Sequence, residues 1–371
     1  MRVICWTSWL AGLLLTAPVS LLAASSNAVP WGIYLLDDIT GTNRLGQLRH
    51  ADRSFINGFS WRLKWTDLDR GTNGPSYDFS MFDTAVAQLQ SFTNNLNGPV
   101  TLTVTLSAQE VPAYVLAAAR ETFQSALPNQ QGFVLTAVPW DAGALARYRN
   151  FVRALGDYAV FDATVGRKVP LRSHAALGQV GVGIVGLQAI RDATQSVRNI
   201  PGYTRTKFIQ SVLSNIHIVQ DQFPAKMTFL GYFAMSDAVL GPTLDSELLA
   251  AIGAEFDGRD AAHPHIGLFQ DVLRNRSPNS TGNFGLNLLT GRALGSPILL
   301  QACGSWLTGG PCSFGRFDTS PENGLRWGFQ AYGCLYYEFY AADLTNPGFE
   351  SIFIEWESQL RDEAAAQMAA P

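Results

Sequence analysis

The sequence predicts an α/β fold, a (β/α)8 TIM barrel that forms a single domain after a signal peptide. Eight short β-like runs alternate with helix-like segments, a pattern typical of a parallel sheet covered by helices. No low-complexity linker, change of composition or short repeat divides the chain after its first residues. The length of 371 residues also suits one such barrel, which occupies roughly 250 residues or more.

The N-terminal segment has the features of a secretory signal peptide. Arg2 precedes an apolar run over 3–15, and small residues follow where cleavage is expected. An uncleaved membrane anchor is the alternative, which the short run and Pro18 disfavour. We expect a signal peptide over 1–26, a barrel over 27–371, and a secreted or periplasmic protein without stable membrane insertion after cleavage.

The β-like runs are the elements expected to form the barrel wall. In chain order they are Trp31–Leu36, Ile56–Trp65, Val100–Leu106, Val180–Leu187, Met227–Met235, Ile266–Leu273, Pro297–Ala302 and Leu335–Tyr340. Because an active site in this fold lies at the C-terminal ends of the strands, these ends determine where candidate residues are sought.

Helix signals lie between the runs. Ser80 with Asp83 predicts a capping-box start for a helix toward Phe92, and Asp141 is expected to cap a helix that ends near Tyr158. A further helix is expected over 204–223, where apolar residues recur at intervals of three and four: Ile209, Val212, Ile216, Val219 and Phe223. The last helix is expected over 349–367.

A doubly wound open sheet is the competing architecture. Its support is a literal GxGxxG at 181–186, the pattern of a dinucleotide-binding turn. These glycines fall inside a predicted strand, however, and no acidic residue follows at the spacing that holds a ribose. They are better interpreted as close packing within a barrel strand.

Charge and motifs exclude several functional classes. The 26 Lys and Arg residues against 30 Asp and Glu residues give a net charge of −4, so no basic excess is available for nucleic acid. The chain contains no P-loop and no GxSxG elbow. His263 and His265 with Asp260 resemble a fragment of a metal site, but no further ligands stand at a suggestive spacing. We expect no cofactor and no metal.

The cysteines fit an oxidising compartment. Cys5 leaves with the signal peptide, and Cys303 and Cys312 flank a Gly-, Pro- and Ser-rich loop. We expect these two residues to form a disulfide. Cys334 lies in an apolar run and is expected to be a buried, inert thiol.

Polar and aromatic residues gather at the predicted strand ends, and their mixture is that of a sugar site. Carboxylates and amides hydrogen-bond hydroxyls, while aromatic faces stack on pyranose rings. The candidates for ligand binding are Arg62, Trp65, Gln188, Asp237, Gln301 and Trp306, and those for catalysis are Glu338, Asp192 and Asp271. Gln109 and Glu110 follow the third strand. For the two tryptophans, a place in the core is the alternative.

Several segments are similar to a known family. NGFSWRLKW at 57–65 and YDFSMFD at 77–83 resemble the opening of cellulase-like and β-galactosidase-like glycoside hydrolase barrels. The segment 138–156 is similar to the one that leads into their fourth strand. YEFY at 337–340 is similar to the end of exported proteins of this type. The resemblance implies a (β/α)8 glycoside hydrolase.

The resemblance also implies a retaining mechanism. It places one Glu at the end of strand four as general acid/base, another at the end of strand seven as nucleophile, and an Arg on strand two beside the nucleophile. Arg62 matches the arginine. The two acidic positions instead read Gln188 and Gln301, and an amide can neither donate the catalytic proton nor form a glycosyl ester.

Three interpretations stay open. In the first, nearby acids act, with Glu338 as nucleophile or base and Asp192 or Asp271 as acid. In the second, the barrel binds glycans without cleaving them, for which Gln188 and Gln301 are suitable neutral groups. In the third, unrelated chemistry uses the same fold. We favour a glycoside hydrolase acting on an oligo- or polysaccharide.

The candidate acids also have structural alternatives. Glu338 is a candidate for an ion pair with an arginine such as Arg62 or Arg326, because a charged residue in an aromatic strand is rarely buried without a partner. Asp271 is a candidate for a salt bridge with Arg274. Asp192 is equally suited to open the helix that follows the fourth strand.

Overall fold

A computed structural model gives the fold of the chain. It describes residues 30–36, 45–95, 98–127, 132–188, 197–232, 244–260, 262–273, 283–307 and 320–369, with the backbone alone at 283–286. None of the helices in these ranges combines the length and the apolarity needed to cross a membrane.

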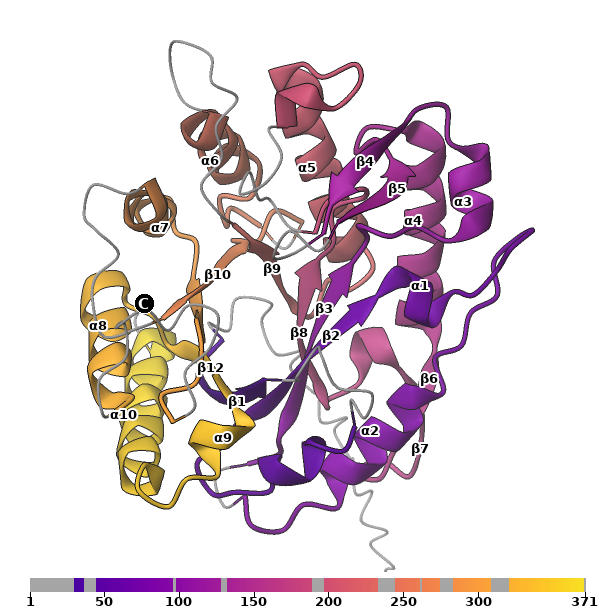
Figure 1. Ribbon diagram of the computed structural model, residues 1–371. Coiled ribbons are helices and arrows are strands. Elements are labelled where there is room, and N and C mark those ends of the chain that lie inside the picture. The colour runs from indigo at the N-terminus through magenta and orange to yellow at the C-terminus, as the bar shows by residue number, and fades with distance from the viewer. Residues whose placement is uncertain are drawn as a thin grey trace, which may run out of the picture.

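Eight parallel strands close into a barrel (Figure 1). They are β1 (Gly32–Leu36), β2 (Gly58–Lys64), β3 (Thr101–Ser107), β8 (Leu177–Val182), β9 (Met227–Gly231), β10 (Gly267–Leu273), β11 (Ile298–Ala302) and β12 (Tyr336–Tyr340). β1 pairs in parallel with both β2 and β12, which closes the sheet. The predicted TIM barrel is confirmed, and the competing open sheet is wrong.

The fourth barrel strand differs from its predicted bounds. The expected run Val180–Leu187 is shifted, since β8 covers Leu177–Val182 and the chain then turns through a bridge between Ile184 and Leu187. Gly186 has φ +78°, which a residue with a side chain rarely adopts, and this conformation allows the turn. Gln188 therefore lies six residues beyond the strand and not at its end.

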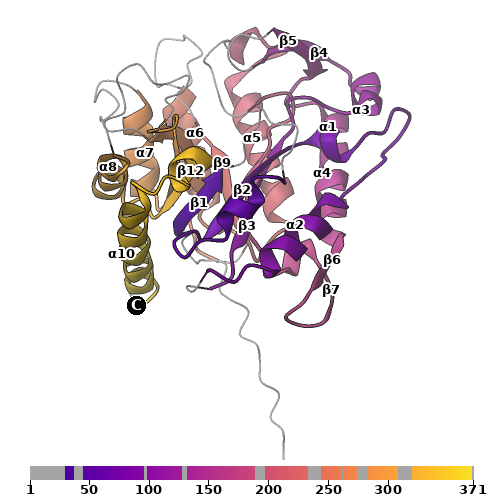
Figure 2. The ribbon, with the colours of Figure 1, turned by 60° about the horizontal axis from the view of Figure 1, so that its bottom comes forward.

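Helices surround the barrel (Figure 2). They are α1 (Trp65–Leu68), α2 (Met81–Gln90), α3 (Ala113–Ala118), α4 (Ala142–Asp157), α5 (Arg205–Gln220), α6 (Leu244–Glu255), α7 (Asn283–Ala293), α8 (Glu322–Tyr332), α9 (Ala341–Leu344) and α10 (Glu350–Ala369). Short 3-10 helices cover Leu48–Ala51, Leu171–Ser173 and Val197–Asn199.

Two of the helix starts show their capping bonds. Asp141 caps α4 by accepting a hydrogen bond from the Ala144 amide at 2.8 Å, as predicted. Thr204 caps α5 in the same way. The capping box expected at Ser80 is wrong, because the Ser80 hydroxyl donates to Asp78 Oδ1 at 2.7 Å and makes no bond to the helix.

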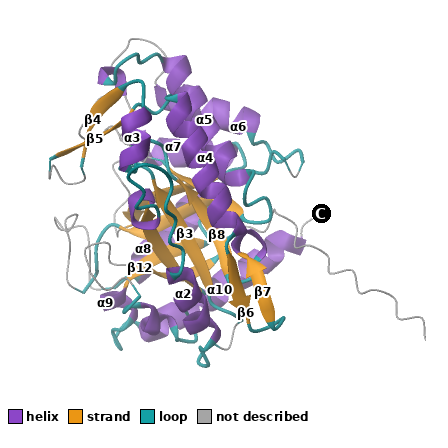
Figure 3. Ribbon diagram, turned by 90° about the vertical axis from the view of Figure 1, so that its right-hand side faces the viewer, coloured by secondary structure: helices purple, strands orange, loops and turns teal. Residues whose placement is uncertain are grey.

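Two antiparallel hairpins interrupt the barrel pattern and were not predicted. β4 (Thr122–Ala126) and β5 (Phe133–Ala137) lie between β3 and α4, and β6 (Ala159–Asp162) and β7 (Arg167–Pro170) lie between α4 and β8. They sit at opposite ends of α4 (Figure 3). The first hairpin follows the C-terminal end of a barrel strand and the second precedes the N-terminal end of the next one, so they mark the two ends of the barrel.

The barrel has two separate apolar regions. Outward-facing strand residues join the helices in one large core, whereas a small cluster fills the lumen: Tyr34, Phe229, Phe269, Leu299 and Tyr336. At β8 the lumen is crowded, since a Cβ on Gly181 would approach the Phe229 ring to 2.7 Å. This contact agrees with close packing of the glycines and not with a nucleotide site.

Candidate active site

The alternation of side chains along β2 places a charged residue inside the barrel. Phe59, Trp61 and Leu63 point outward and are buried in the large core. Residues with period two share a face of a strand, so Arg62 and Lys64 point to the lumen side. Arg62 is the inner of the two and lies at the C-terminal end of the barrel, where active sites of this fold are found.

Arg62 binds two side chains from β11 and β12, which lie beyond β1 in the barrel. It donates to Glu338 Oε2 on β12 at 2.7 Å and also to Gln301 Oε1 on β11. Its guanidinium lies 5.0 Å from the centre of the Phe269 ring. Glu338 is fully buried, and its charge requires a partner in a medium of low dielectric constant. Arg62 supplies that partner.

Tyr336 binds the second oxygen of Glu338. Its hydroxyl lies 2.8 Å from Glu338 Oε1. The pKa of Tyr336 is raised well above its ordinary value, mainly by burial and then by the charge of Glu338. The hydroxyl therefore keeps the proton that it donates. Both oxygens of the carboxylate are thereby hydrogen-bonded, which fixes its orientation.

A chain of hydrogen bonds continues from Tyr336 into the lumen. The Tyr336 hydroxyl lies 3.1 Å from Thr103 Oγ1, and Thr103 lies 2.5 Å from Gln179 Oε1. Gln179 Nε2 then donates to the Tyr34 hydroxyl at 3.2 Å. Sequence reasoning missed these residues. The signal was available in part, because Tyr336 is two residues before Glu338 and therefore shares its face of β12.

A second ion pair lies nearer to solvent. Lys64, two residues beyond Arg62, donates to Glu110 Oε1 at 2.6 Å. Glu110 follows β3 and was noted from the sequence as a strand-end residue, whereas Lys64 was missed. At the C-terminal mouth, the described residues thus form a buried pair, Arg62 with Glu338, and a partly exposed pair, Lys64 with Glu110, which is called the exposed pair below.

Of the other two predicted acids, the structure describes Asp271. It is half-buried on β10, two residues beyond Phe269, whose ring contacts Arg62. Gln188 is half-buried in the loop after β8, and no described contact joins it to Arg62. Asp192 and Asp237 lie outside the described residues. The structure therefore brings together Arg62, Gln301 and Glu338.

The two tryptophan candidates lie in the core. Trp65 has no exposed surface, and its ring centre lies 5.5 Å from that of Phe151 and 5.2 Å from that of Tyr148. Trp306 is 7% exposed and packs against Phe339. Neither ring offers the open face on which a sugar stacks, because each is covered by neighbouring aromatic side chains.

The cysteines are only partly described. Cys303 is buried after β11, while Cys312 lies outside the described residues, so their disulfide stays a prediction. Cys334 is a free, buried cysteine. Burial raises the pKa of its thiol to about 12, in agreement with the inert thiol expected from the sequence.

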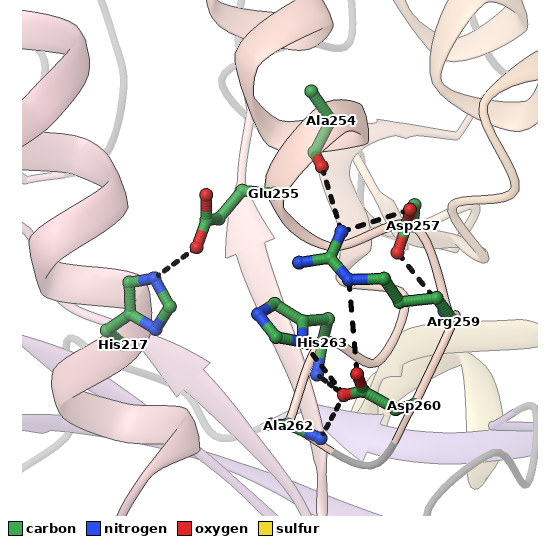
Figure 4. A network of polar contacts seen from close by, with 8 residues as sticks. All are labelled: His217, Ala254, Glu255, Asp257, Arg259, Asp260, Ala262 and His263. Carbon is green, nitrogen blue, oxygen red and sulfur yellow. Dashed lines mark hydrogen bonds and ion pairs between the residues drawn. The ribbon is translucent and has the colours of Figure 1, made fainter.

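His263 of the possible metal fragment makes a local contact with Asp260 (Figure 4). His263 Nδ1 lies 2.8 Å from Asp260 Oδ1, and this hydrogen bond is the main reason that the pKa of Asp260 is lowered. Arg259 contacts both Asp257 and Asp260. Within the described ranges, no three His, Cys, Asp or Glu residues form a group that could hold a metal ion.

These features define a class of protein: a (β/α)8 barrel with one arginine-centred polar cluster at its C-terminal mouth. No protein-family model matches the chain, and no curated protein matches its sequence. The chain is, however, similar in fold to solved structures of glycoside hydrolases.

Three of these structures illustrate the similarity. An intracellular xylanase from Thermoanaerobacterium saccharolyticum, in complex with xylotriose, has 12% identity over 74% of this chain and 73% of that chain, with a TM-score of 0.41. A glucosidase from Croceicoccus marinus has 14% identity, coverage of 90% and 68%, and a TM-score of 0.44. A β-mannanase from the blue mussel Mytilus edulis has 12% identity, coverage of 89% and 91%, and a TM-score of 0.42. Such values concern the course of the chain and not its chemistry.

Proposed function

We propose that the C-terminal mouth of the barrel binds an oligo- or polysaccharide and that the protein is an O-glycosyl hydrolase. The observation that carries this proposal is the Glu338 carboxylate, which Arg62 and Tyr336 orient at the end of the barrel where this fold performs its chemistry. Arg62, Gln301 and Glu338 also supply the donors and acceptors that sugar hydroxyls require.

Glycoside hydrolysis needs two carboxyl groups, one ionised and one carrying a proton. Glu338 suits the ionised role of nucleophile or base, since Arg62 compensates its charge. Among the residues that the structure describes, Asp271 is the candidate for the acid. Because β10 and β12 are separated only by β11, the two backbones lie roughly 10 Å apart. Asp192 is the alternative acid.

Binding without cleavage is a second candidate, and two observations favour it. Glu338 is fully buried with both oxygens hydrogen-bonded, so a substrate must displace a neighbour to reach it. Gln301 occupies the position at which the family resemblance implies a nucleophilic glutamate, and it binds Arg62 as a neutral group. A barrel of this kind would retain a carbohydrate site without the chemistry.

Two measurements separate these functions. Turnover of a panel of aryl glycosides is compared among the wild type, Glu338→Gln and Asp271→Asn, and binding of unmodified oligosaccharides is followed by calorimetry. For a hydrolase we expect turnover by the wild type and its loss in Glu338→Gln, while circular dichroism still shows a folded barrel. Undiminished turnover in Glu338→Gln would remove Glu338 from the mechanism. Oligosaccharide affinity without cleavage of any bound ligand would establish the second candidate.

A further inference from the structure

The exposed ion pair of the mouth is held in place from both sides. Lys64 ends β2, and its backbone amide donates to Asp67 Oδ2 at 3.2 Å. The next residue is Trp65, which is fully buried among aromatic rings. The backbone that carries the Lys64 side chain is therefore anchored, although the side chain itself is 43% exposed.

Glu110 has an equivalent anchor. The preceding residue, Gln109, is buried, and its amide nitrogen donates to Ser125 Oγ at 2.9 Å and to the Ala126 carbonyl at 2.7 Å. These contacts join the end of β3 to the β4–β5 hairpin. They fix the backbone next to Glu110, whose own side chain is 31% exposed.

Stability alone does not account for this arrangement. Exposed ion pairs contribute little to folding, because water solvates both charges and the pair costs side-chain entropy. Two buried side chains, Trp65 and Gln109, nevertheless hold the chain beside Lys64 and Glu110. Fixing polar groups on rigid elements before a ligand arrives is how a binding site lowers the entropic cost of association.

The position of the pair connects it with the buried centre. Lys64 lies two residues beyond Arg62 on the same face of β2, which corresponds to roughly 7 Å along the strand. This distance is of the order of one sugar unit. Arg62 is paired with Glu338 and Lys64 with Glu110, so these two pairs together carry no net charge.

We propose that Lys64 and Glu110 form a recognition pair that binds two neighbouring hydroxyls of a neutral sugar unit. The ammonium group donates to one hydroxyl oxygen, and the carboxylate accepts a hydrogen bond from the other. The balanced charge of the two pairs favours neutral sugars over uronic acids. This inference rests on the proposed function, in that it assumes a carbohydrate site, but it holds for hydrolysis and for binding alike.

The test uses the full chain with the variants Lys64→Met and Glu110→Gln, which remove each charge at nearly constant volume. Calorimetry measures affinity for xylo-, cello- and manno-oligosaccharides and for an oligogalacturonide. We expect each variant to bind the preferred neutral oligosaccharide about tenfold or more weakly, as for the loss of a hydrogen bond to a charged group. The thermal unfolding midpoint should stay close to that of the wild type.

An exposed ion pair at the other end of the barrel provides the matched control. Arg172, just before β8, contacts Asp157 at the end of α4, and their side chains are 33% and 56% exposed. Arg172→Met and Asp157→Asn should leave affinity unchanged. Equal affinity of Lys64→Met, Glu110→Gln and the wild type would overturn the recognition pair while leaving the proposed function intact.

The remaining outcomes are also decisive. Tighter binding of the oligogalacturonide than of every neutral oligosaccharide would overturn the choice of neutral sugars. A wild type that neither binds nor cleaves any sugar in the panel would refute the proposed function, and the recognition pair with it.

Discussion

Two ion pairs begin at neighbouring lumen-facing positions of β2, and they differ in their surroundings. Arg62 binds Glu338, which has no exposed surface and whose other oxygen is bound by Tyr336. Lys64 binds Glu110, and both side chains remain partly in water. Two positions of β2 that are only two residues apart thus differ in their need for a partner. The buried carboxylate of Glu338 requires Arg62, whereas Lys64 and Glu110 are also solvated by water.

The inner and the outer pair have different roles in such a site. In the buried pair, removal of one partner leaves an uncompensated charge in a medium of low dielectric constant, so the pair is costly to break. In the exposed pair, water replaces a lost partner, so either side chain is available to a ligand at little cost in stability. We therefore expect the inner pair to dominate stability and the outer pair to affect recognition alone.

The largest effect is expected from Glu338→Leu. This change leaves Arg62 without its carboxylate and should lower the free energy of unfolding by about 3–5 kcal/mol. Urea denaturation at pH 7 measures it. The double variant Arg62→Met with Glu338→Leu removes both charges and should recover most of the loss, because apolar residues of similar volume can replace a buried ion pair. A double variant as unstable as Glu338→Leu would contradict this account.

A smaller effect is expected from Tyr336→Phe. The variant keeps the ring but loses the hydrogen bond to Glu338, which should lower the free energy of unfolding by about 1.5–3 kcal/mol. The control is the same change in the Arg62→Met, Glu338→Leu background, where no carboxylate is present and the cost should shrink. Equal costs in both backgrounds would show that Tyr336 acts independently of Glu338.

The third prediction isolates a pH dependence that does not come from either pair. His174 is buried near the N-terminal end of β8, and its Nδ1 accepts a hydrogen bond from the Ala176 amide at 3.1 Å. Burial lowers its pKa below the ordinary value of 6.5, against the opposing charge of Asp162. Below pH 6.5, His174 is therefore protonated to a greater extent in the unfolded chain than in the folded protein.

The contribution of His174 to the free energy of unfolding is fully present above pH 6.5. It is lost as the pH falls through 6.5 toward the lowered pKa of His174 in the folded protein. Through this one residue, the free energy of unfolding changes by at most about 1.4 kcal/mol per pH unit. Urea denaturation at pH 7.5 and pH 5.5 should show a smaller decrease for His174→Gln than for the wild type. The same decrease in both proteins would exclude His174 as its source.

The smallest effect is expected at the exposed pair. Lys64→Met or Glu110→Gln should change the free energy of unfolding by less than about 1 kcal/mol, since exposed pairs contribute about 0–1 kcal/mol. Urea denaturation beside Arg172→Met, the exposed control at the other end of the barrel, checks this value. A loss comparable to that of Glu338→Leu would remove the contrast between the two pairs of β2.

Much of the architecture could be predicted from local patterns. Each of the eight predicted runs overlaps a barrel strand, because lumen-facing and core-facing residues of a barrel strand are both largely apolar and give continuous β-branched and aromatic runs. The α4 start at Asp141 was predicted because its capping bond is local in sequence. The Ser80 cap failed for a related reason, since Asp78, only two residues away, competes for the same hydroxyl.

The remaining fold errors also have physical causes. The end of β8 was misplaced because the apolar, glycine-containing run continues past Val182 into a turn that depends on the positive φ of Gly186. The hairpins β4–β5 and β6–β7 were missed because their strands are only four or five residues long and because β4 and β7 carry few of the apolar residues that identify a barrel strand.

Local sequence patterns were enough to predict the alternation of strands and helices, the parallel barrel that follows from it, and Arg62, Gln301 and Glu338 as candidates at strand ends. Three contacts could be seen only in the folded barrel: Arg62 binds Glu338 across β1, Tyr336 binds the other oxygen of Glu338, and Lys64 binds Glu110. The alternation of side chains along a strand shows which face of the sheet a residue is on. The contacts that the residue makes there depend on the closure and register of the barrel. Those are properties of strands far apart in the chain, so no local pattern contains them.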